Sequence, residues 1–280
     1  MNHKQSHFNR RTVLRTAAGL SVGGLAGCLN GSGETRAGTS IANDDADDQG
    51  ILRQVTVDGT ELVVKLGSAA DVDQLNLIQP NGELFGTRER AAGVRQVSFD
   101  IGTAYDPGGY RIIAVHGEET VAETGVEIRP QLEIVAVGLF RNNPDKPWDE
   151  VYGESETNRL QNAEACVSVH NSGTGPDAAV SLEFSGDIPN PIEDPRNSGL
   201  YDADKVTIPP SETRDLFSSS LPFGAHAGND GMGCIVEKNT GEFSVLVGSR
   251  VFAKKISERF TVEYSGSDVM RDCSITIYRR

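Results

Sequence analysis

From residue 51 onward, the chain consists of short runs in which apolar and polar residues alternate. The runs are rich in Val, Ile, Thr, Phe and Tyr, and they are separated by Gly, Pro, Asn and Asp. A period of two places every second side chain on the same face, which is typical of strands in antiparallel sheets. No long segment shows the 3.6-residue period of an amphipathic helix. The pattern therefore predicts an all-β fold.

The first block of this pattern, residues 51–130, is long enough for about seven strands. The alternating runs are 62–66, 74–78, 83–85, 97–101, 110–116 and 121–128, and Pro80-Asn81-Gly82 marks a turn between the second and third. Strands of this number and spacing predict a small immunoglobulin-like β-sandwich.

A motif at the start of the run 110–116 supports this fold. Asp106, Gly108 and Tyr110 match the D-x-G-x-Y pattern of the immunoglobulin tyrosine corner, which this segment resembles. The resemblance implies that the Tyr110 hydroxyl bonds back to nearby backbone and fixes the turn into its strand. Ile112 stands where the family usually has a cysteine, so this block is expected to lack an inter-sheet disulfide. The resemblance implies a fold and no function.

Arg129-Pro130 marks the boundary to a second block, residues 131–280. A strand that ends in a V-x-N-x-G pattern, Val169 to Gly173, resembles the early strand of CARDB-like adhesion modules. The strand, proline-rich turn and strand over 206–213 resemble another part of the same modules. The resemblance implies a second immunoglobulin-type sandwich. The block is larger than the roughly 100 residues of such a domain, and the excess is assigned to three insertions: 142–162, 186–204 and 219–233.

The insertions are the expected site of function, because binding residues concentrate on long loops of a sheet scaffold. Their aromatic side chains are candidate binding anchors: Trp148, Tyr152, Tyr201 and Phe223. For Trp148 the alternative is that the ring only covers the end of the sandwich. The acidic residues around Trp148 favour a solvated surface over a calcium site. No cofactor and no metal site is predicted.

The N-terminal residues have a different pattern, an apolar run of mostly small residues from Ala17 to Gly27. The run is too short and too weakly apolar for a membrane-spanning helix, which needs about 20 apolar residues. With Arg10 and Arg11 before it and Cys28 after it, the segment resembles a twin-arginine lipoprotein signal. The resemblance implies export of the folded chain, removal of residues 1–27 and a lipid on Cys28. The alternative is a signal peptide that is cleaved beside an unmodified cysteine.

Residues 28–50 are expected to form an acidic, disordered tether, since they hold too few large apolar side chains to offset the entropy of ordering. The acidic run 44–48 lacks the later Glu and the spacing of an EF-hand loop, so a solvated spacer is the preferred interpretation. The sequence thus predicts a signal peptide, a tether and two tandem immunoglobulin-like sandwiches: residues 1–27, 28–50, 51–130 and 131–280.

Three further cysteines remain if Cys28 carries a lipid. An odd number in an exported protein indicates one disulfide and one thiol. We predict the pair Cys234–Cys273, because both residues lie at strand edges and the segment between them folds back through hairpins. Cys166 stays open as an alternative partner. The lack of a C-x-x-C spacing argues against a metal site built from these cysteines.

Charge narrows the choice of partners. The chain has 26 Lys and Arg against 40 Asp and Glu, a net charge of −14 that becomes −18 if a signal with four basic residues and no acidic residue is removed. Nucleic acids and anionic membrane surfaces are therefore not expected as partners. The composition, with many Asp and Glu and few Lys, resembles that of haloarchaeal protein surfaces. An acidic bacterial lipoprotein is the alternative source.

Catalytic motifs are not found in the chain. After the predicted signal segment 1–27, the chain contains no G-x-S-x-G, H-E-x-x-H, phosphate-loop or dinucleotide-binding pattern. His116 and His170 fall at predicted strand ends, where a structural role is expected. His226 has Asp230 nearby in the sequence, but this single pair is not sufficient to indicate a catalytic base and the carboxylate that would orient it. We therefore expect a non-enzymatic protein, lipid-anchored on the outer face of the cell membrane, that binds an envelope protein or glycan or has a structural or adhesion role. The alternative is an exported hydrolase or an accessory module of an extracellular enzyme system.

Overall fold

The structure is a computed structural model that describes residues 50–142 except 69, 164–224 except 202, 234, 238–266 and 273–280. Within these residues the regular secondary structure is β-strand, apart from a 3₁₀ turn at Phe140–Asn142. The all-β prediction is confirmed. The signal, most of the tether and the predicted residues Arg10, Arg11 and Cys28 lie outside the described residues.

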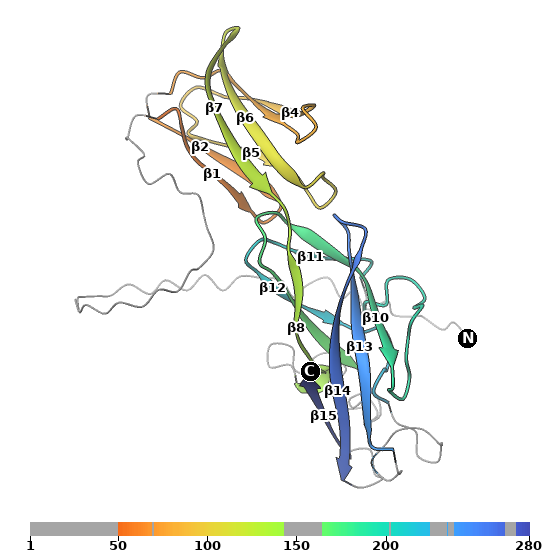
Figure 1. Ribbon diagram of the computed structural model, residues 1–280. Helices are drawn as coiled ribbons and strands as arrows, with labels where there is room; N and C mark the ends of the chain where they lie inside the picture. Colours follow the sequence, from red (N-terminus) through yellow and green to blue (C-terminus); the bar gives the residue numbers. More distant parts are fainter. Residues whose placement is uncertain are drawn as a thin grey trace, which may run out of the picture. The chain divides into compact units, whose positions relative to one another are not determined.

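The first block forms seven strands in two sheets (Figure 1). The strands are β1 (Leu52–Asp58), β2 (Glu61–Leu66), β3 (Gln74–Ile78), β4 (Leu84–Glu89), β5 (Gln96–Asp100), β6 (Gly108–His116) and β7 (Glu119–Ile128). One sheet has the order β1-β2-β5 and the other β4-β3-β6-β7, with every neighbouring pair antiparallel. The six alternating runs of the sequence correspond to β2–β7, and β1 completes the seven.

Alternation along these strands builds the first hydrophobic core. In β3, Leu75 and Leu77 are buried between half-exposed neighbours, and in β5 the buried residues are Val97 and Phe99. Such residues from both sheets form one apolar cluster that runs from Leu62 to Ile128. Full burial of a large apolar side chain stabilises a fold by about 1.5–3 kcal/mol, so this inward face decides the register of each strand.

The predicted tyrosine corner is present at the start of β6. The hydroxyl of Tyr110 donates a hydrogen bond of 2.9 Å to the backbone carbonyl of Asp106, and its ring is almost completely buried. A Cβ atom at Gly108 would lie 3.0 Å from the side chain of Pro80. Glycine therefore allows the turn before β6 to pass close to the turn between β3 and β4.

In the part of the second block that the structure describes, eight strands form two further sheets (Figure 1). The strands are β8 (Leu132–Leu139), β9 (Ala165–Asn171), β10 (Asp177–Gly186), β11 (Val206–Ile208), β12 (Thr213–Phe217), β13 (Thr240–Ser249), β14 (Lys255–Gly266) and β15 (Cys273–Arg279). The sheet orders are β12-β9-β8 and β11-β10-β13-β14-β15. A second apolar cluster, separate from the first, lies between these sheets.

The two sandwiches share one topology. In each block the first, second and fifth strands form the small sheet, and the fourth, third, sixth and seventh follow one another in the large sheet. The second sandwich differs by the edge strand β15 and by longer connections between β8 and β9, β10 and β11, and β12 and β13. The predicted tandem arrangement of immunoglobulin-like sandwiches is therefore observed, with β15 as one strand beyond the seven that the two sandwiches share.

Candidate functional site

The long connections of the second sandwich leave from one end of it. In the small sheet, β8 and β12 both end beside the start of β9. In the large sheet, β10 and β14 end where β13 and β15 begin. The three predicted insertions, 142–162, 186–204 and 219–233, therefore start from this end, which we call the loop end. In immunoglobulin variable domains, the antigen-binding loops lie at the opposite end of the sandwich.

Ser218 joins the bases of two of these connections. Its N–H donates to the carbonyl of Ala165 over 3.0 Å. Its hydroxyl accepts a hydrogen bond of 2.9 Å from the Ala165 N–H and donates one of 2.7 Å to the Ser220 carbonyl. Ala165 begins β9, and the N–H of Phe140, directly after β8, donates to the neighbouring Glu164 carbonyl over 2.9 Å. The flanks of 143–163 and of 218–239 are thus held together at the loop end.

Asn190 joins the remaining insertion to the same frame. Its side-chain N–H groups donate to the carbonyls of Leu221 and Gly224, each over 2.9 Å. Its backbone N–H donates to the Pro222 carbonyl over 3.1 Å. These bonds engage backbone acceptors of a tight turn, which the Gly224 N–H closes by donating to the Leu221 carbonyl over 3.2 Å. The turn is the one that carries Phe223.

Phe223 was predicted to be an exposed binding anchor, and this prediction is wrong. The side chain is fully buried, and its ring makes edge contacts with Phe243 at 5.3 Å and Phe184 at 6.0 Å between centroids. The buried hydroxyl of Tyr264 donates to the Phe223 carbonyl over 3.0 Å, and burial raises the pKa of Tyr264. Phe223 therefore fixes the third insertion to the core, because burial of an aromatic ring outweighs its position in a loop.

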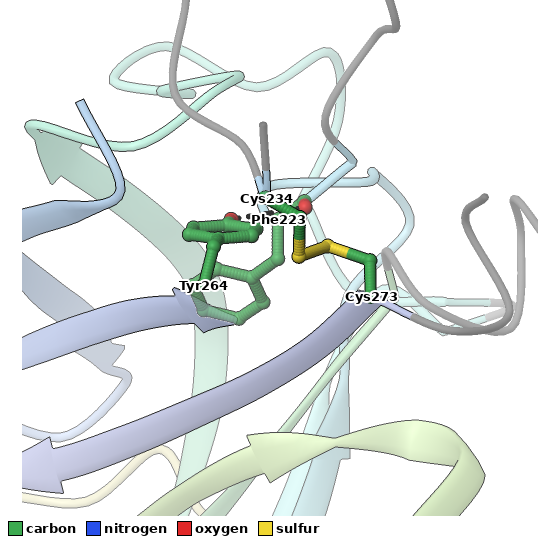
Figure 2. The surroundings of a disulfide bond; sticks show 4 residues. All are labelled: Phe223, Cys234, Tyr264 and Cys273. Carbon is green, nitrogen blue, oxygen red and sulfur yellow. Dashed lines mark hydrogen bonds between the residues drawn. A yellow bond between two sulfur atoms is a disulfide. The ribbon is translucent and has the colours of Figure 1, made fainter. Parts of the chain in front are cut away.

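A disulfide joins Cys234 and Cys273 beside Phe223 and Tyr264 (Figure 2). The Cα atoms are 5.7 Å apart, and Cys273, the first residue of β15, is buried. The predicted pairing is therefore present, while Cys166 is buried in β9 and takes no part in it. The bond links Cys234, the residue directly after the third insertion, to the additional edge strand β15, so two segments at the loop end are covalently connected.

The second insertion closes the side of the sandwich. Its Ile192 exchanges backbone hydrogen bonds of 2.6 and 2.9 Å with Phe184, and the Ser198 carbonyl accepts from Leu182 over 2.8 Å, so the segment runs along the edge of β10. It then meets β12, where the N–H of Tyr201 donates to the Phe217 carbonyl over 2.8 Å. Unpaired edge groups invite association with other strands. Much of this insertion therefore covers an edge, and Tyr201 is only half-exposed.

The other candidate residues are distributed as follows. Trp148 and Tyr152 lie outside the described residues, as does His226. His116 ends β6, and the ring of His170 in β9 makes a 3.1 Å contact with the Thr213 hydroxyl. Within the described ranges, no group of three or more His, Cys, Asp or Glu side chains is arranged to hold a metal ion. No helix in the described part of the chain is long and apolar enough to cross a membrane.

Sequence reasoning missed one buried polar network. Asp177 is fully buried at the start of β10, and its carboxylate accepts hydrogen bonds from the Ser249 hydroxyl and from the N–H groups of Ala178 and Val251. A single Asp between apolar residues carries no sequence signal for such a role. The network lies at the end opposite the loop end.

Comparisons with known proteins assign neither a family nor a relative. No known protein family and no curated protein matches the chain. Among solved structures, a β-glucuronidase from glycoside hydrolase family 2 is similar over 75% of this chain and 19% of its own length, at 12% identity and a TM-score of 0.23. The BSP domain of a biofilm associated protein is similar over 74% and 28%, at 13% identity and a TM-score of 0.22. The human OSCAR ligand-binding domain is similar over 80% and 92%, at 10% identity and a TM-score of 0.21. TM-scores this low carry no assignment of fold or function.

Proposed function

We propose that this chain is an exported, lipid-anchored surface protein that binds an envelope protein or glycan through the loop end of its second sandwich. The anchor rests on the Arg10-Arg11 pair, the apolar run and Cys28 in that order. The Cys234–Cys273 disulfide supports an oxidising compartment, since structural disulfides form outside the reducing cytosol. High acid and few lysines favour a haloarchaeal source.

The observation that carries the binding role is the path of the chain through the sandwiches. β1 begins beside the end of β2, whereas β7 ends beside the start of β6, so the chain enters the first sandwich at one end and leaves at the other. It enters the second sandwich at Leu132, opposite the loop end. The extended connections therefore lie at the end of the second sandwich opposite the one where the chain enters it from the first sandwich, and this is the end that we propose a partner binds.

The anchor is tested by replacing Cys28 with Ser and fractionating cells. The wild-type chain is expected in the membrane fraction, and the Cys28→Ser chain is expected in the soluble extracellular fraction, because two acyl chains are needed for durable attachment. Arg15→Lys, which leaves the paired arginines intact, serves as the matched control and is expected to stay in the membrane. A Cys28→Ser chain that remains membrane-bound contradicts the anchor.

The binding role is tested by capture of envelope proteins and glycans at high salt. Trp148→Ala with Tyr152→Ala is expected to reduce capture at least tenfold, because truncating an aromatic hot-spot anchor costs about 2 kcal/mol or more and a tenfold change corresponds to about 1.4 kcal/mol. Leu84→Ala is the control, since Leu84 is 57% exposed on the first sandwich. Equal loss in both variants, or no specific capture by the wild-type chain, contradicts binding through the loop end.

A further inference from the structure

The linker between the two sandwiches, residues 129–131, is bonded to the connection between β9 and β10, residues 172–176. The carbonyl of Arg129 accepts from the N–H groups of Thr174 (2.8 Å) and Gly175 (3.1 Å), and the Arg129 N–H donates to the Thr174 hydroxyl (3.1 Å). The carbonyl of Gln131 accepts from the Ser172 N–H over 2.9 Å. Both segments belong to one compact unit, Asp45–Arg280. We call this contact the junction.

Asn171 organises the junction from a fully buried position. Its side-chain oxygen accepts from the N–H groups of Gln131 (3.0 Å) and Gly173 (3.1 Å). Its side-chain nitrogen donates to the carbonyls of Gly175 (2.8 Å) and Ile208 (3.0 Å). An amide side chain has two donor hydrogens and two acceptor lone pairs, so every one of them is used. The asparagine of the V-x-N-x-G pattern thus connects linker, loop and β11.

Two glycines of the same loop are required by its close approach to the linker. A Cβ atom at Gly173 would overlap the Arg129 carbonyl oxygen. A Cβ atom at Gly175 would overlap the Tyr105 hydroxyl and lie 2.8 Å from Cγ2 of Ile128. Contacts of this kind cannot be relieved by moving a flexible side chain alone, because backbone stands on the other side. The loop and the linker therefore pack at the shortest distance that the backbone allows.

The first sandwich contributes Tyr105, which belongs to its core. The Tyr105 hydroxyl is buried and donates to the Pro176 carbonyl of the second sandwich over 2.9 Å. Burial, followed by the nearby charge of Asp177, raises the pKa of Tyr105. In the opposite direction, Val251 from the β13–β14 connection packs against the first core, and the Asp177 carboxylate accepts its N–H over 3.0 Å. Each sandwich thus places a residue against the other.

We propose that the junction couples the two sandwiches, so that they reorient and unfold together instead of moving independently about a flexible linker. A short linker without such bonds would leave its backbone torsions free. Here the polar backbone groups of Arg129 and Gln131 are all bonded, and buried contacts lie on both sides. The first sandwich then acts as a fixed mount for the second, whatever the loop end binds.

The coupling is tested with the full chain carrying Cys28→Ser, by ¹⁵N relaxation and by hydrogen exchange. The parent chain is expected to show one rotational diffusion tensor for both sandwiches. Gly175→Ala is expected to give two tensors, because its methyl group displaces Tyr105 and Arg129. Val64→Ala destabilises the first core. In the parent chain, this substitution is expected to speed amide hydrogen exchange in β9 and β10 of the second sandwich by about tenfold. In the Gly175→Ala background, the same substitution is expected to leave that exchange rate unchanged.

Matched variants separate coupling from general loss of stability. Gly138→Ala adds a methyl group with nothing within 4 Å of it, and Tyr110→Phe removes a 2.9 Å hydroxyl-to-carbonyl bond inside one sandwich. Both variants are expected to keep one tensor. Tyr105→Phe removes a bond of equal length across the junction and is expected to loosen the junction, so that the two sandwiches show separate tensors. If Gly175→Ala does not fold, Tyr105→Phe and Thr174→Ala decide the question. Two tensors in the parent chain, or one tensor in all junction variants, overturn the proposal.

Discussion

Asn171 illustrates how a short polar motif acquires a role only through its partners. The V-x-N-x-G pattern could be recognised in the sequence, but two of the groups that Asn171 binds, the Gln131 N–H and the Ile208 carbonyl, are about 40 residues away in either direction. A buried amide with all four hydrogen bonds made is specific, because neither a charged nor a smaller side chain satisfies the same groups.

Replacing Asn171 by Asp is expected to lower the free energy of unfolding by about 3 kcal/mol or more. A carboxylate cannot donate, so the Gly175 and Ile208 carbonyls would lose their donors and face a negative charge. Asn76→Asp is the matched control, because the Asn76 oxygen only accepts, from Gln74 and Thr87, and a carboxylate keeps both bonds. Urea unfolding measures the difference, and equal costs in the two variants would contradict the assigned role.

We expect the free energy of unfolding to fall at alkaline pH because of the buried hydroxyl of Tyr110. Burial, with a contribution from the Asp106 charge, raises the pKa of Tyr110 to about 12 from an ordinary value of 10.0. The folded state therefore holds the phenolic proton more tightly than the unfolded state. The stabilisation is complete below pH 10, and about 2–3 kcal/mol is lost as the pH rises from 10 to 12.

This pH dependence is measured by urea unfolding at intervals between pH 9 and 12. Tyr110→Phe removes the group and is expected to flatten the decline. Some slope will remain, since burial raises the pKa of Tyr105 and Tyr264 in the same direction. A variant with the full wild-type decline would show that Tyr110 does not contribute.

At the scale of elements, the segment 187–205 shows that the sequence predicts an irregular connection but not the strands against which it packs. Its Pro and Asp content correctly indicates an irregular connection, but nothing local shows that it lies along β10 and reaches β12. Phe223 was misjudged for the same reason, since a loop position suggests exposure while the core cluster of phenylalanines is formed by residues distant in sequence. Edge covering and core contacts are decided by long-range pairing.

Gly199 tests whether this covering segment is needed. Its φ is +73°, and a Cβ atom would overlap the Leu182 carbonyl oxygen. Gly199→Ala is expected to cost clearly more than the 1–2 kcal/mol or so of a left-handed alanine alone, because the segment must leave the edge of β10. Gly117→Ala is the control, with a φ of +59° and open space around the added atom. Thermal unfolding compares the two, and equal shifts in melting temperature would argue against a structural role of the contact.

At the scale of the whole molecule, the sequence predicted strands β2–β7 of the first sandwich, because alternation and turn residues are local signals. It also favoured the Cys234–Cys273 pair, with Cys166 as the open alternative. The shared strand order of both sandwiches and the gathering of long connections at one end were not predictable in this way. They depend on which strands pair across the sheets, as in β2 with β5 and β9 with β12. Trp148 and Tyr152 stay predictions.

The acidic surface predicts stability that increases with salt. With a net charge of −14, the folded chain repels itself, and the screening length falls from about 10 Å at 0.1 M to about 3 Å at 1 M salt. The melting temperature is expected to rise by about 5 °C or more between 0.1 and 2 M KCl. Glu118→Gln with Glu119→Gln, both exposed, is expected to reduce that gain. A melting temperature that is independent of KCl contradicts the prediction.

The opposite entry and exit points of the first sandwich have a mechanical consequence. Tension between a fixed tether and a captured partner would pull the start of β1 out of one end and the end of β7 out of the other. Each strand would then slide along its antiparallel neighbour, so that the hydrogen bonds of the β1–β2 and β6–β7 pairs resist together in shear. Strands pulled from the same end would instead open one bond at a time. The strand order thus suits a protein that is stretched along its own length.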